Sequence, residues 1–283
     1  MIKIAVLITC FNRKNKTISC IKDIYQQIKD INTQIDIYIT DGGSSDGTPD
    51  YIKKYYPEIN LYIQEGLFWA GGMRFSWGKA IINKDYDYFW LVNDDTHLYK
   101  DCLSILLDTE KKCNTLFGKY GIYIGSTKDP NNGQFTYGGK KLEQWGNNKS
   151  ITLYPNGQIQ KCDLGNANIM LIHNSVFNKI GGLSEKYTHG IADYDYTLRA
   201  VKANIPVLVA PLYCGECLYD HGNNWLSNSS FRKRLSFLYS PKGLAYKEYL
   251  YFIKTFFPKQ YPIAFIKLWL KTLCPSLWNK FKK

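Results

Sequence analysis

The chain has 283 residues, of which 45% are hydrophobic, and this is enough apolar material for a folded core and excludes a disordered chain. Its eight cysteines form no disulfide framework, and the single CxxC pair, Cys214 and Cys217, has no second pair, so we expect reduced thiols rather than a zinc knuckle. No apolar run approaches the roughly 18 residues of a membrane span, and no signal-peptide pattern opens the sequence.

The net charge of +12 is unevenly distributed. Residues 231–283 contain twelve Lys and Arg against one acid, Glu248, whereas 24 basic and 23 acidic groups nearly cancel in residues 1–230. We therefore expect a near-neutral domain at 1–230 and a basic, aromatic, helical extension at 231–283. A local excess of positive charge indicates that the extension meets a polyanionic surface.

The first third of the chain alternates strand and helix patterns. In order, we expect a buried strand at 3–9, a helix to about 27, a strand at 34–40, a helix at 50–55, a strand at 59–64, a glycine loop at 66–72, a helix at 73–83 and a buried strand at 88–92. Thr48 and Pro49 are predicted as the N-cap and first residue of the second helix. This alternation predicts an α/β fold with a mainly parallel sheet and helices on both faces.

The remaining elements are expected to complete that sheet. They are a helix at 101–113, a strand at 120–125, loops and a hairpin over 126–165, a strand at 168–172, helices at 175–180 and 192–203, and a last strand at 206–210.

Two carboxylates follow the apolar run at 88–92, after Asn93. Asp94 and Asp95 are expected to emerge where the strand ends, because Asp is almost never fully buried unless it is paired or bound to a cation. Ligands of open α/β sheets bind at this edge, and hard carboxylate oxygens suit Mg²⁺ or Mn²⁺ together with substrate phosphates. An Asp-rich turn without a ligand is the simpler alternative.

Asp41 ends the second predicted strand in a similar position. With Thr9 at the end of the first strand, three strand ends then line one crevice, where a carboxylate can accept a hydrogen bond from a base imide or a ribose hydroxyl. Glycines such as Gly43 allow the backbone to approach a nucleotide closely. The residues at 41–47 are also those of an ordinary turn, so a turn without a binding role remains the alternative.

A second acidic segment lies at 190–199. Asp195 and Arg199 are four residues apart on a predicted helix and can form an ion pair. Asp193 faces elsewhere and is a candidate general base, although acids at helix N-termini are common for electrostatic reasons alone. His221, in a later polar loop, is a candidate to complete a metal site, but a lone loop histidine often has no such role.

Together these motifs resemble the family 2 glycosyltransferases with their GT-A fold, in particular the rhamnosyltransferase-like branch of polysaccharide biosynthesis. The resemblance covers about residues 1–225. The matching segments, in the family's order, are Leu7 to Arg13, Asp41 to Thr48, Asn93-Asp94-Asp95, Gly181 to Glu185 followed by Asp193, Asp195 and Arg199, and finally His221.

The resemblance implies an inverting transfer of a sugar from a UDP- or dTDP-sugar to a hydroxyl of a glycan or lipid-linked acceptor in surface polysaccharide or lipooligosaccharide synthesis. It implies Asp193 as the catalytic base and a Mg²⁺ or Mn²⁺ ion held by Asp95 and His221. It places the donor at Thr9, Phe11, Asn12, Arg13, Asp41, Gly43, Gly71, Gly72, Arg74, Asn93 and Asp94.

Three positions depart from the family pattern. Asn93 replaces the first acid of the usual metal motif, Ala192 replaces the usual Glu before the base, and Arg74 stands in a loop where Asn is frequent. These departures leave one alternative open, a degenerate domain that binds a nucleotide-sugar or glycan without turnover.

The extension has a different character. Ile266, Trp269, Leu270 and Leu273 share one helix face, and lysines lie beside it. Such a helix is typical of an anionic membrane interface, although it can also pack on the catalytic domain. We expect a cytoplasmic protein, peripheral at the inner face of the cell membrane, with no nucleic-acid partner; the sequence is compatible with a homo-oligomer.

Overall fold

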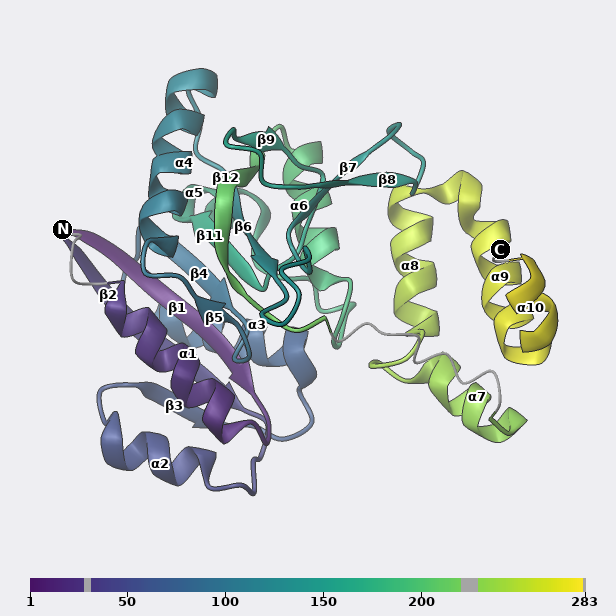
Figure 1. Ribbon diagram of the computed structural model, residues 1–283, viewed down its shortest axis with the longest axis horizontal. Coiled ribbons are helices and arrows are strands. Elements are labelled where there is room, and N and C mark those ends of the chain that lie inside the picture. The colour runs from purple at the N-terminus through teal and green to yellow at the C-terminus, as the bar shows by residue number, and fades with distance from the viewer. Residues whose placement is uncertain (28–31, 220–228, 282–283) are drawn as a thin grey trace.

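The structure is a computed structural model that describes residues 1–27, 32–219 and 229–281 (Figure 1). A mixed central sheet has the strand order β3-β2-β1-β4-β11-β6-β12-β5, with β9 paired to β12. A second, three-stranded sheet has the order β10-β7-β8. The strands are β1 (Ile2–Cys10), β2 (Thr33–Asp41), β3 (Asn60–Ile63), β4 (Tyr88–Val92), β5 (His97–Leu98), β6 (Ile122–Lys128), β7 (Gly139–Leu142), β8 (Ser150–Leu153), β9 (Gln160–Lys161), β10 (Leu164–Gly165), β11 (Ile169–His173) and β12 (Val207–Glu216).

Helices cover both faces of the central sheet, and further helices follow β12 (Figure 1). They are α1 (Lys14–Gln26), α2 (Thr48–Tyr55), α3 (Phe68–Asn83), α4 (Cys102–Phe117), α5 (Asn174–Ile180), α6 (Ala192–Lys202), α7 (Phe231–Tyr239), α8 (Tyr246–Phe256), α9 (Tyr261–Leu273) and α10 (Pro275–Phe281), with a 3₁₀ turn η1 (Pro258–Gln260) before α9. The predicted α/β class with a mainly parallel sheet is confirmed. The antiparallel pairings of this sheet are those of β11 with β4 and β6, and those of β5 and β9 with β12.

The strand order reverses direction beside β1. The chain runs outward from β1 to β2 and β3, then returns to β4 on the other side of β1, and all three of these pairings are parallel. The carboxyl ends of β1, β2 and β4 therefore meet at one edge of the sheet. Ligands of open α/β sheets bind at such a reversal, so the topology alone selects this edge as the place for a site.

Two helix starts differ from the sequence prediction. Helix α3 begins at Phe68, so Gly71 and Gly72 lie inside a helix rather than in a loop. A Cβ at Gly72 would lie 2.5 Å from Thr9 Cγ2, which shows that glycine lets α3 pack closely on β1. Helix α2 begins at Thr48 with Gly47 as its N-cap, so Thr48 is the first helical residue rather than the predicted cap, and Asp46 Oδ1 accepts from the Thr48 amide at 3.0 Å.

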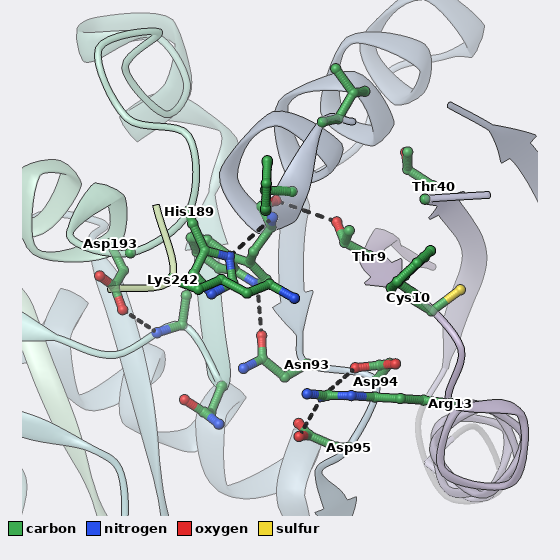
Figure 2. Close-up of a pocket in the computed structure, with 18 of the residues that line it drawn as sticks. Thr9, Cys10, Arg13, Thr40, Asn93, Asp94, Asp95, His189, Asp193 and Lys242 are labelled. Atoms are coloured by element: carbon green, nitrogen blue, oxygen red, sulfur yellow. Dashed lines mark hydrogen bonds and ion pairs between the residues drawn. The ribbon is translucent and has the colours of Figure 1, made fainter. Parts of the chain in front are cut away.

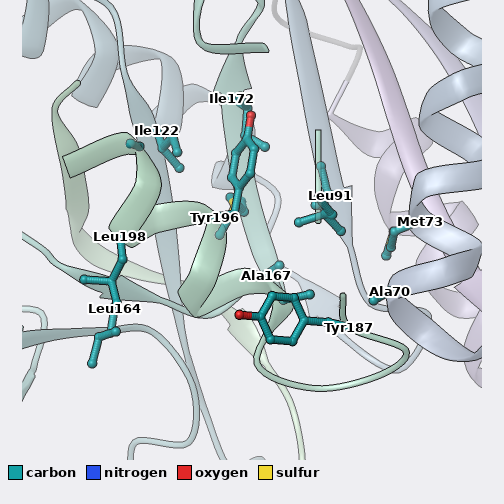
Figure 3. Close-up of a cluster of buried hydrophobic side chains, with 14 of the residues drawn as sticks. Ala70, Met73, Leu91, Ile122, Leu164, Ala167, Ile172, Tyr187, Tyr196 and Leu198 are labelled. Carbon is teal, nitrogen blue, oxygen red and sulfur yellow. The ribbon is translucent and has the colours of Figure 1, made fainter. Parts of the chain in front are cut away.

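Two apolar clusters pack on the two faces of the central sheet. One lies under α1 and α4, and the other lies between the sheet, α3 and α6. In the second cluster the Trp77 ring contacts Phe89, Phe177 and Tyr196 at centroid distances of 5.1 to 5.7 Å. Figure 3 shows Tyr196 and Leu198 of α6 in this cluster, together with Ala70 and Met73 of α3.

The helices α7 to α10, called the extension here, join the same core. Leu250, Ile253 and Leu268 are buried and belong to the cluster that contains Trp77 and Tyr196. Polar contacts also cross between the two parts: Gln260 Nε2 lies 2.6 Å from Asn147 Oδ1 in the loop between β7 and β8. The extension therefore packs on the elements that precede it, called the body here, through a continuous core, and the division at residue 230 stays a prediction. In the described parts of the chain, none of the helices has both the length and the apolar character needed to cross a membrane.

Candidate active site

A cavity of about 500 Å³ lies at the carboxyl ends of β1, β2 and β4, and we call it the strand-end cavity (Figure 2). Its walls come from the loop after β1, the start of α3, the end of β4 and the loops before β11 and α6. Of the residues predicted for catalysis, donor binding or metal binding, the structure places the following in its lining: Thr9, Phe11, Arg13, Asn93, Asp94, Asp95 and Asp193. These residues lie far apart in the sequence, and the strand order brings them together.

An acidic pair forms one side of this cavity. Asp94 is 5% exposed and Arg13 Nη1 lies 3.3 Å from its Oδ1 and 2.6 Å from Asp95 Oδ2. Burial, and next the neighbouring Asp95 carboxylate, raise the pKa of Asp94 to about 7, against the opposing effect of Arg13. Two adjacent carboxylates that are largely shielded from solvent require a cation nearby, and the Arg13 guanidinium supplies one.

The same pair is chemically suited to a divalent cation. Mg²⁺ and Mn²⁺ prefer carboxylate oxygens and usually share them with substrate phosphates. The Arg13 side chain is 41% exposed, so it has room to turn away from Asp95 when a stronger cation arrives. Among the described residues no group of three or more His, Cys, Asp and Glu forms a ready metal cluster, and His221 lies outside them. The residues present therefore fit a metal held by Asp95 and Asp94 together with ligand oxygens.

Trp69 connects three parts of the cavity wall. Its indole Nε1 donates to Asn93 Oδ1 at 2.8 Å, its carbonyl accepts from Thr9 Oγ1 at 3.4 Å, and its amide donates to His189 Nδ1 at 3.4 Å. The preceding Phe68 has φ +52°, a left-handed conformation that costs energy for an aromatic residue. The start of α3 is therefore held in a strained shape by contacts to β1, β4 and the loop before α6.

The loop after β2 has an organising role that differs from the expected donor contact. The Asp41 side chain is fully buried, and its Oδ1 accepts from the amides of Gly43 and Ser44 at 2.9 and 2.6 Å. Asn12 Oδ1 accepts from the amide of Ser45 at 2.8 Å and so ties this loop to the end of β1. Gly43 has φ +92°, which glycine permits without strain. Asp41, Asn12 and Gly43 thus shape the cavity edge rather than line it.

Three other expected donor residues also lie outside the cavity lining. Arg74 Nη1 donates to the carbonyls of Ser184 and Tyr187, both at 2.8 Å, so its guanidinium secures the loop before α6. Gly71 and Gly72 lie in α3, where Gly72 faces Thr9. The loop position that the sequence indicated for these residues was wrong, because helix α3 starts earlier than its glycines suggested.

Asp193 lies at the start of α6, across the cavity from the acidic pair in the view of Figure 2. Its Oδ2 accepts from Asn166 Nδ2 and from the Ala167 amide at 3.3 Å each, and its Oδ1 accepts from the Tyr194 amide at 2.9 Å. Burial raises the pKa of Asp193 above its ordinary value, against these hydrogen bonds. A positioned carboxylate with a raised pKa suits a general base.

The neighbouring acid has a different environment. Asp195 is buried, its Oδ2 lies 2.8 Å from Arg199 Nε, and its Oδ1 accepts from Tyr187 at 3.1 Å. Arg199 also donates to the carbonyls of Ile180 and Gly182 at 2.7 Å. This pair holds α6 to the preceding loop, and neither residue lines the cavity.

A second cavity, of about 760 Å³, adjoins the first and lies between the body and the extension; we call it the extension groove. Six residues line both cavities: Tyr137, Asn166, His189, Gly190, Asp193 and Lys242. Asp193 is the only carboxylate among these six. Asp193 therefore lies where the strand-end cavity and the extension groove meet, and from there its carboxylate can reach a ligand in either cavity.

The lining also contains residues that the sequence did not indicate as site residues, among them Trp69, Asn166, His189 and Lys242. Trp69 stands within a segment that the sequence singled out, but only for its glycines and Arg74. Asn166 and Lys242 lie in segments predicted as loops or as part of the extension, and His189 had no partner within its own sequence neighbourhood. No local pattern distinguishes these four, because each reaches the site through a distant contact.

A known protein family matches the first part of the chain. The model of the family described as "Glycosyl transferase family 2" matches residues 5–179, more than half of the chain. No curated protein matches the chain.

Solved structures show the same fold at low sequence identity. The mannosyltransferase PcManGT from Pyrobaculum calidifontis, in complex with GDP-Man and Mn²⁺, has a TM-score of 0.55 and 12% identity over 98% of this chain and 72% of its own. S. aureus TarS 1–349 in complex with UDP has a TM-score of 0.52 and 14% identity over 76% of this chain and 60% of its own. TarS 1–349 without a named ligand has a TM-score of 0.52 and 13% identity over 96% of this chain and 73% of its own. These likenesses bear out the GT-A fold expected from the sequence.

Proposed function

The chain belongs to glycosyl transferase family 2, and on that premise we propose that it is an inverting glycosyltransferase with Asp193 as its general base. The observation that carries the proposal is the place of Asp193 at the junction of the strand-end cavity and the extension groove. A base in this position reaches a donor in the first space and an acceptor in the second. We assign the nucleoside-diphosphate sugar to the strand-end cavity and the acceptor to the groove.

The reaction is a single displacement. The acceptor hydroxyl gives its proton to the Asp193 carboxylate while its oxygen forms a bond to the anomeric carbon of the donor sugar. The bond between that carbon and the diphosphate oxygen breaks, and the nucleoside diphosphate leaves with the electron pair. Attack from the face opposite the leaving group inverts the configuration, and no covalent enzyme intermediate forms.

The donor end of the cavity offers groups of the right kinds. Phe11 lines the cavity and is 51% exposed, so its ring is available to a nucleobase face. Arg13 is a cation beside the space for the diphosphate. When bound by Asp95 and Asp94, Mg²⁺ or Mn²⁺ would supply further positive charge for the diphosphate. We propose a UDP- or dTDP-sugar as the donor. GDP-sugars should also be tested, because PcManGT was solved with GDP-Man.

We further propose that the protein acts at the inner face of the cell membrane on a glycan or lipid-linked acceptor of surface polysaccharide synthesis, within the rhamnosyltransferase-like branch. The support is the charge and exposure of the extension. Its net charge is +11 from residue 231 onward, and it exposes a row of apolar side chains: Ile263, Ile266, Leu273 and Leu277. Cationic helices with exposed apolar residues bind anionic membrane interfaces.

Release of nucleoside diphosphate from a panel of UDP-, dTDP- and GDP-sugars tests the enzyme. The panel is run with Mn²⁺ or Mg²⁺ and with chelator, on wild type and on Asp193→Asn. We expect metal-dependent release from one donor class, lost in the variant, and inverted anomeric configuration in the product by NMR.

Two results would count against the proposal. Donor binding without turnover, even with lipid-linked acceptors, would favour the degenerate binding module that Asn93 and Ala192 left open. No binding of any nucleotide-sugar would remove the assignment of the strand-end cavity.

A further inference from the structure

The extension groove has one wall from the body and one from the extension. The body supplies Lys140 of β7 and Tyr194 of α6, next to Asp193. The extension supplies Lys242, Lys267 and Lys271, from the segment before α8 and from α9. Lys267 and Lys271 are four residues apart on α9 and therefore lie on one side of that helix. The groove thus exists only because α9 packs against the rest of the molecule.

The charge of this lining is strongly one-sided. Four lysines line the groove, and within the part of the chain that the structure describes its single lining carboxylate is Asp193. Three of these cations lie over aromatic rings: Lys140 over Tyr194 at 5.7 Å, Lys271 over Trp278 at 5.0 Å, and Lys242 over Phe68 at 5.9 Å. A concave surface lined by one sign of charge concentrates an oppositely charged ligand.

The segment that carries Lys242 is fixed by its own backbone. The Leu244 amide donates to the Phe237 carbonyl at 3.0 Å, and the Ala245 amide donates to the Ser240 carbonyl at 3.1 Å. A Cβ at Gly243 would lie 2.0 Å from Phe237 O, so only glycine fits there. Lys242 is therefore held where the two cavities meet, close to Asp193 in the lining of both.

We propose that the extension groove binds an acceptor that carries phosphate. The inference rests on the proposed function, because it places the acceptor hydroxyl at Asp193. The lysines hold the phosphate groups, and the rings of Tyr194, Tyr249 and Trp278 provide flat faces for sugar or lipid carbons. Phosphate chemistry of this kind occurs in a lipid-linked diphosphate and in a phosphodiester-linked polymer, and the experiment separates these two sources.

The test measures anion binding with the donor space already filled. Full-length protein is saturated with UDP, dTDP and GDP together, and inorganic pyrophosphate, farnesyl diphosphate and a glycerol-phosphate hexamer are titrated by calorimetry at low and raised salt. We expect saturable, salt-sensitive binding by wild type. Lys267→Gln/Lys271→Gln should weaken it at least tenfold. The matched control, Lys247→Gln/Lys254→Gln, removes the same charge from exposed lysines of α8 that do not line the groove, and it should stay within twofold of wild type.

Tighter binding of farnesyl diphosphate than of the hexamer would support a lipid-linked diphosphate, and tighter binding of the hexamer would support a phosphodiester polymer. No saturable binding by wild type, or an equal loss in both double variants, would overturn the inference. If Lys267→Gln/Lys271→Gln lowers the melting temperature, Lys140→Gln probes the groove from its other wall. Nucleoside diphosphate release by wild type tests the proposed function separately, so the two ideas can fail independently.

Discussion

The strand-end cavity and the extension differ in how their charged side chains are paired. In the cavity and at its edge, the carboxylates of Asp41, Asp94, Asp95 and Asp193 each have a hydrogen-bond or ion-pair partner at a defined distance. In the extension, cations outnumber acids twelve to one and large apolar side chains such as Ile266 remain exposed.

This difference indicates two kinds of partner. Directional hydrogen bonds hold the side chains of the cavity in one geometry, as binding and reaction of a small ligand require. Charge and exposed apolar area act without a fixed geometry, so they suit a large anionic surface whose groups move. The extension groove has features of both, because it combines the hydrogen-bonded Asp193 of the body with lysines of the extension.

The largest effect should come from the junction itself. Asp193→Asn keeps the size of the side chain but removes the base, so we expect transfer to fall by about 10²–10⁴-fold. Donor affinity should change little, since the variant leaves the acidic pair intact. Nucleoside diphosphate release with acceptor present measures the loss, and Asp108→Asn, at an exposed acid of α4, is the control. Full activity in Asp193→Asn would remove the proposed base.

The continuous core predicts that body and extension unfold together. Leu268 is 5% exposed, so Leu268→Ala should destabilise the protein by about 2–5 kcal/mol. We expect one cooperative transition shifted to lower temperature by calorimetry, whereas Leu273→Ala, at a half-exposed site on the same helix, should shift it little. Two separate transitions would show that the extension is an independent unit.

The exposed apolar row can be tested against an exposed pair in the body. Ile263→Glu/Ile266→Glu removes apolar contact and adds two negative charges, so binding to anionic vesicles should weaken by about a hundredfold. Phosphatidylcholine vesicles with and without phosphatidylglycerol provide the assay. Ile81→Glu/Ile82→Glu changes two exposed residues of α3 in the same way and should leave vesicle binding unaffected. Equal loss in both variants would assign the effect to net charge alone.

The acid limb of the pH profile, measured with saturating donor and metal, reports the environment of Asp193. A cation held by Asp95 and Asp94 would keep Asp94 ionised, although burial raises its pKa to about 7 in the free protein. Only the ionised Asp193 carboxylate accepts a proton, and burial raises its pKa, so activity should begin to fall at a higher pH than for an exposed Asp. Below that pKa, kcat/KM should decline about tenfold for each pH unit. A profile that stays flat down to the ordinary titration range of Asp would contradict this assignment.

The smallest expected effect concerns Arg13. Arg13→Gln leaves Asp94 and Asp95 facing each other without their cation, and with partial solvent screening the cost should be about 1–2 kcal/mol, a shift of a few degrees in Tm. Mn²⁺ should restore more stability to the variant than to wild type. Thermal unfolding in chelator and in Mn²⁺ measures both, with Arg232→Gln in the extension as control. No difference between the variants would mean that Arg13 is not a counter-ion.

Parts of the site were predictable because they depend on position along a strand or helix. A buried strand followed by Asn93, Asp94 and Asp95 must place them at the sheet edge, and a parallel neighbour brings Thr9 to the same edge. The spacing of Asp195 and Arg199 predicts a pair because residues four apart share one helix face. These relations follow from the periods of strand and helix alone.

The roles of other predicted residues depend on which loops from distant parts of the chain pack beside them. Asp41 resembles Asp95 in sequence context, yet its carboxylate turns back to bind its own loop, because two backbone amides lie within 3 Å. Arg74 points to the carbonyls of Ser184 and Tyr187, more than a hundred residues away.

Three properties could be read from the amino-acid sequence: the α/β class, the strand ends that carry polar groups, and the separation of a near-neutral body from a basic extension. These properties follow from local periodicity and composition, which need no knowledge of the chain path. The folded chain was needed to see that Asn166, His189 and Lys242 join Asp193, and that α9 closes a lysine-lined groove beside it. The physical reason is that a site is made by side chains whose mutual distances are set by packing between distant segments, and no short stretch of sequence encodes those distances.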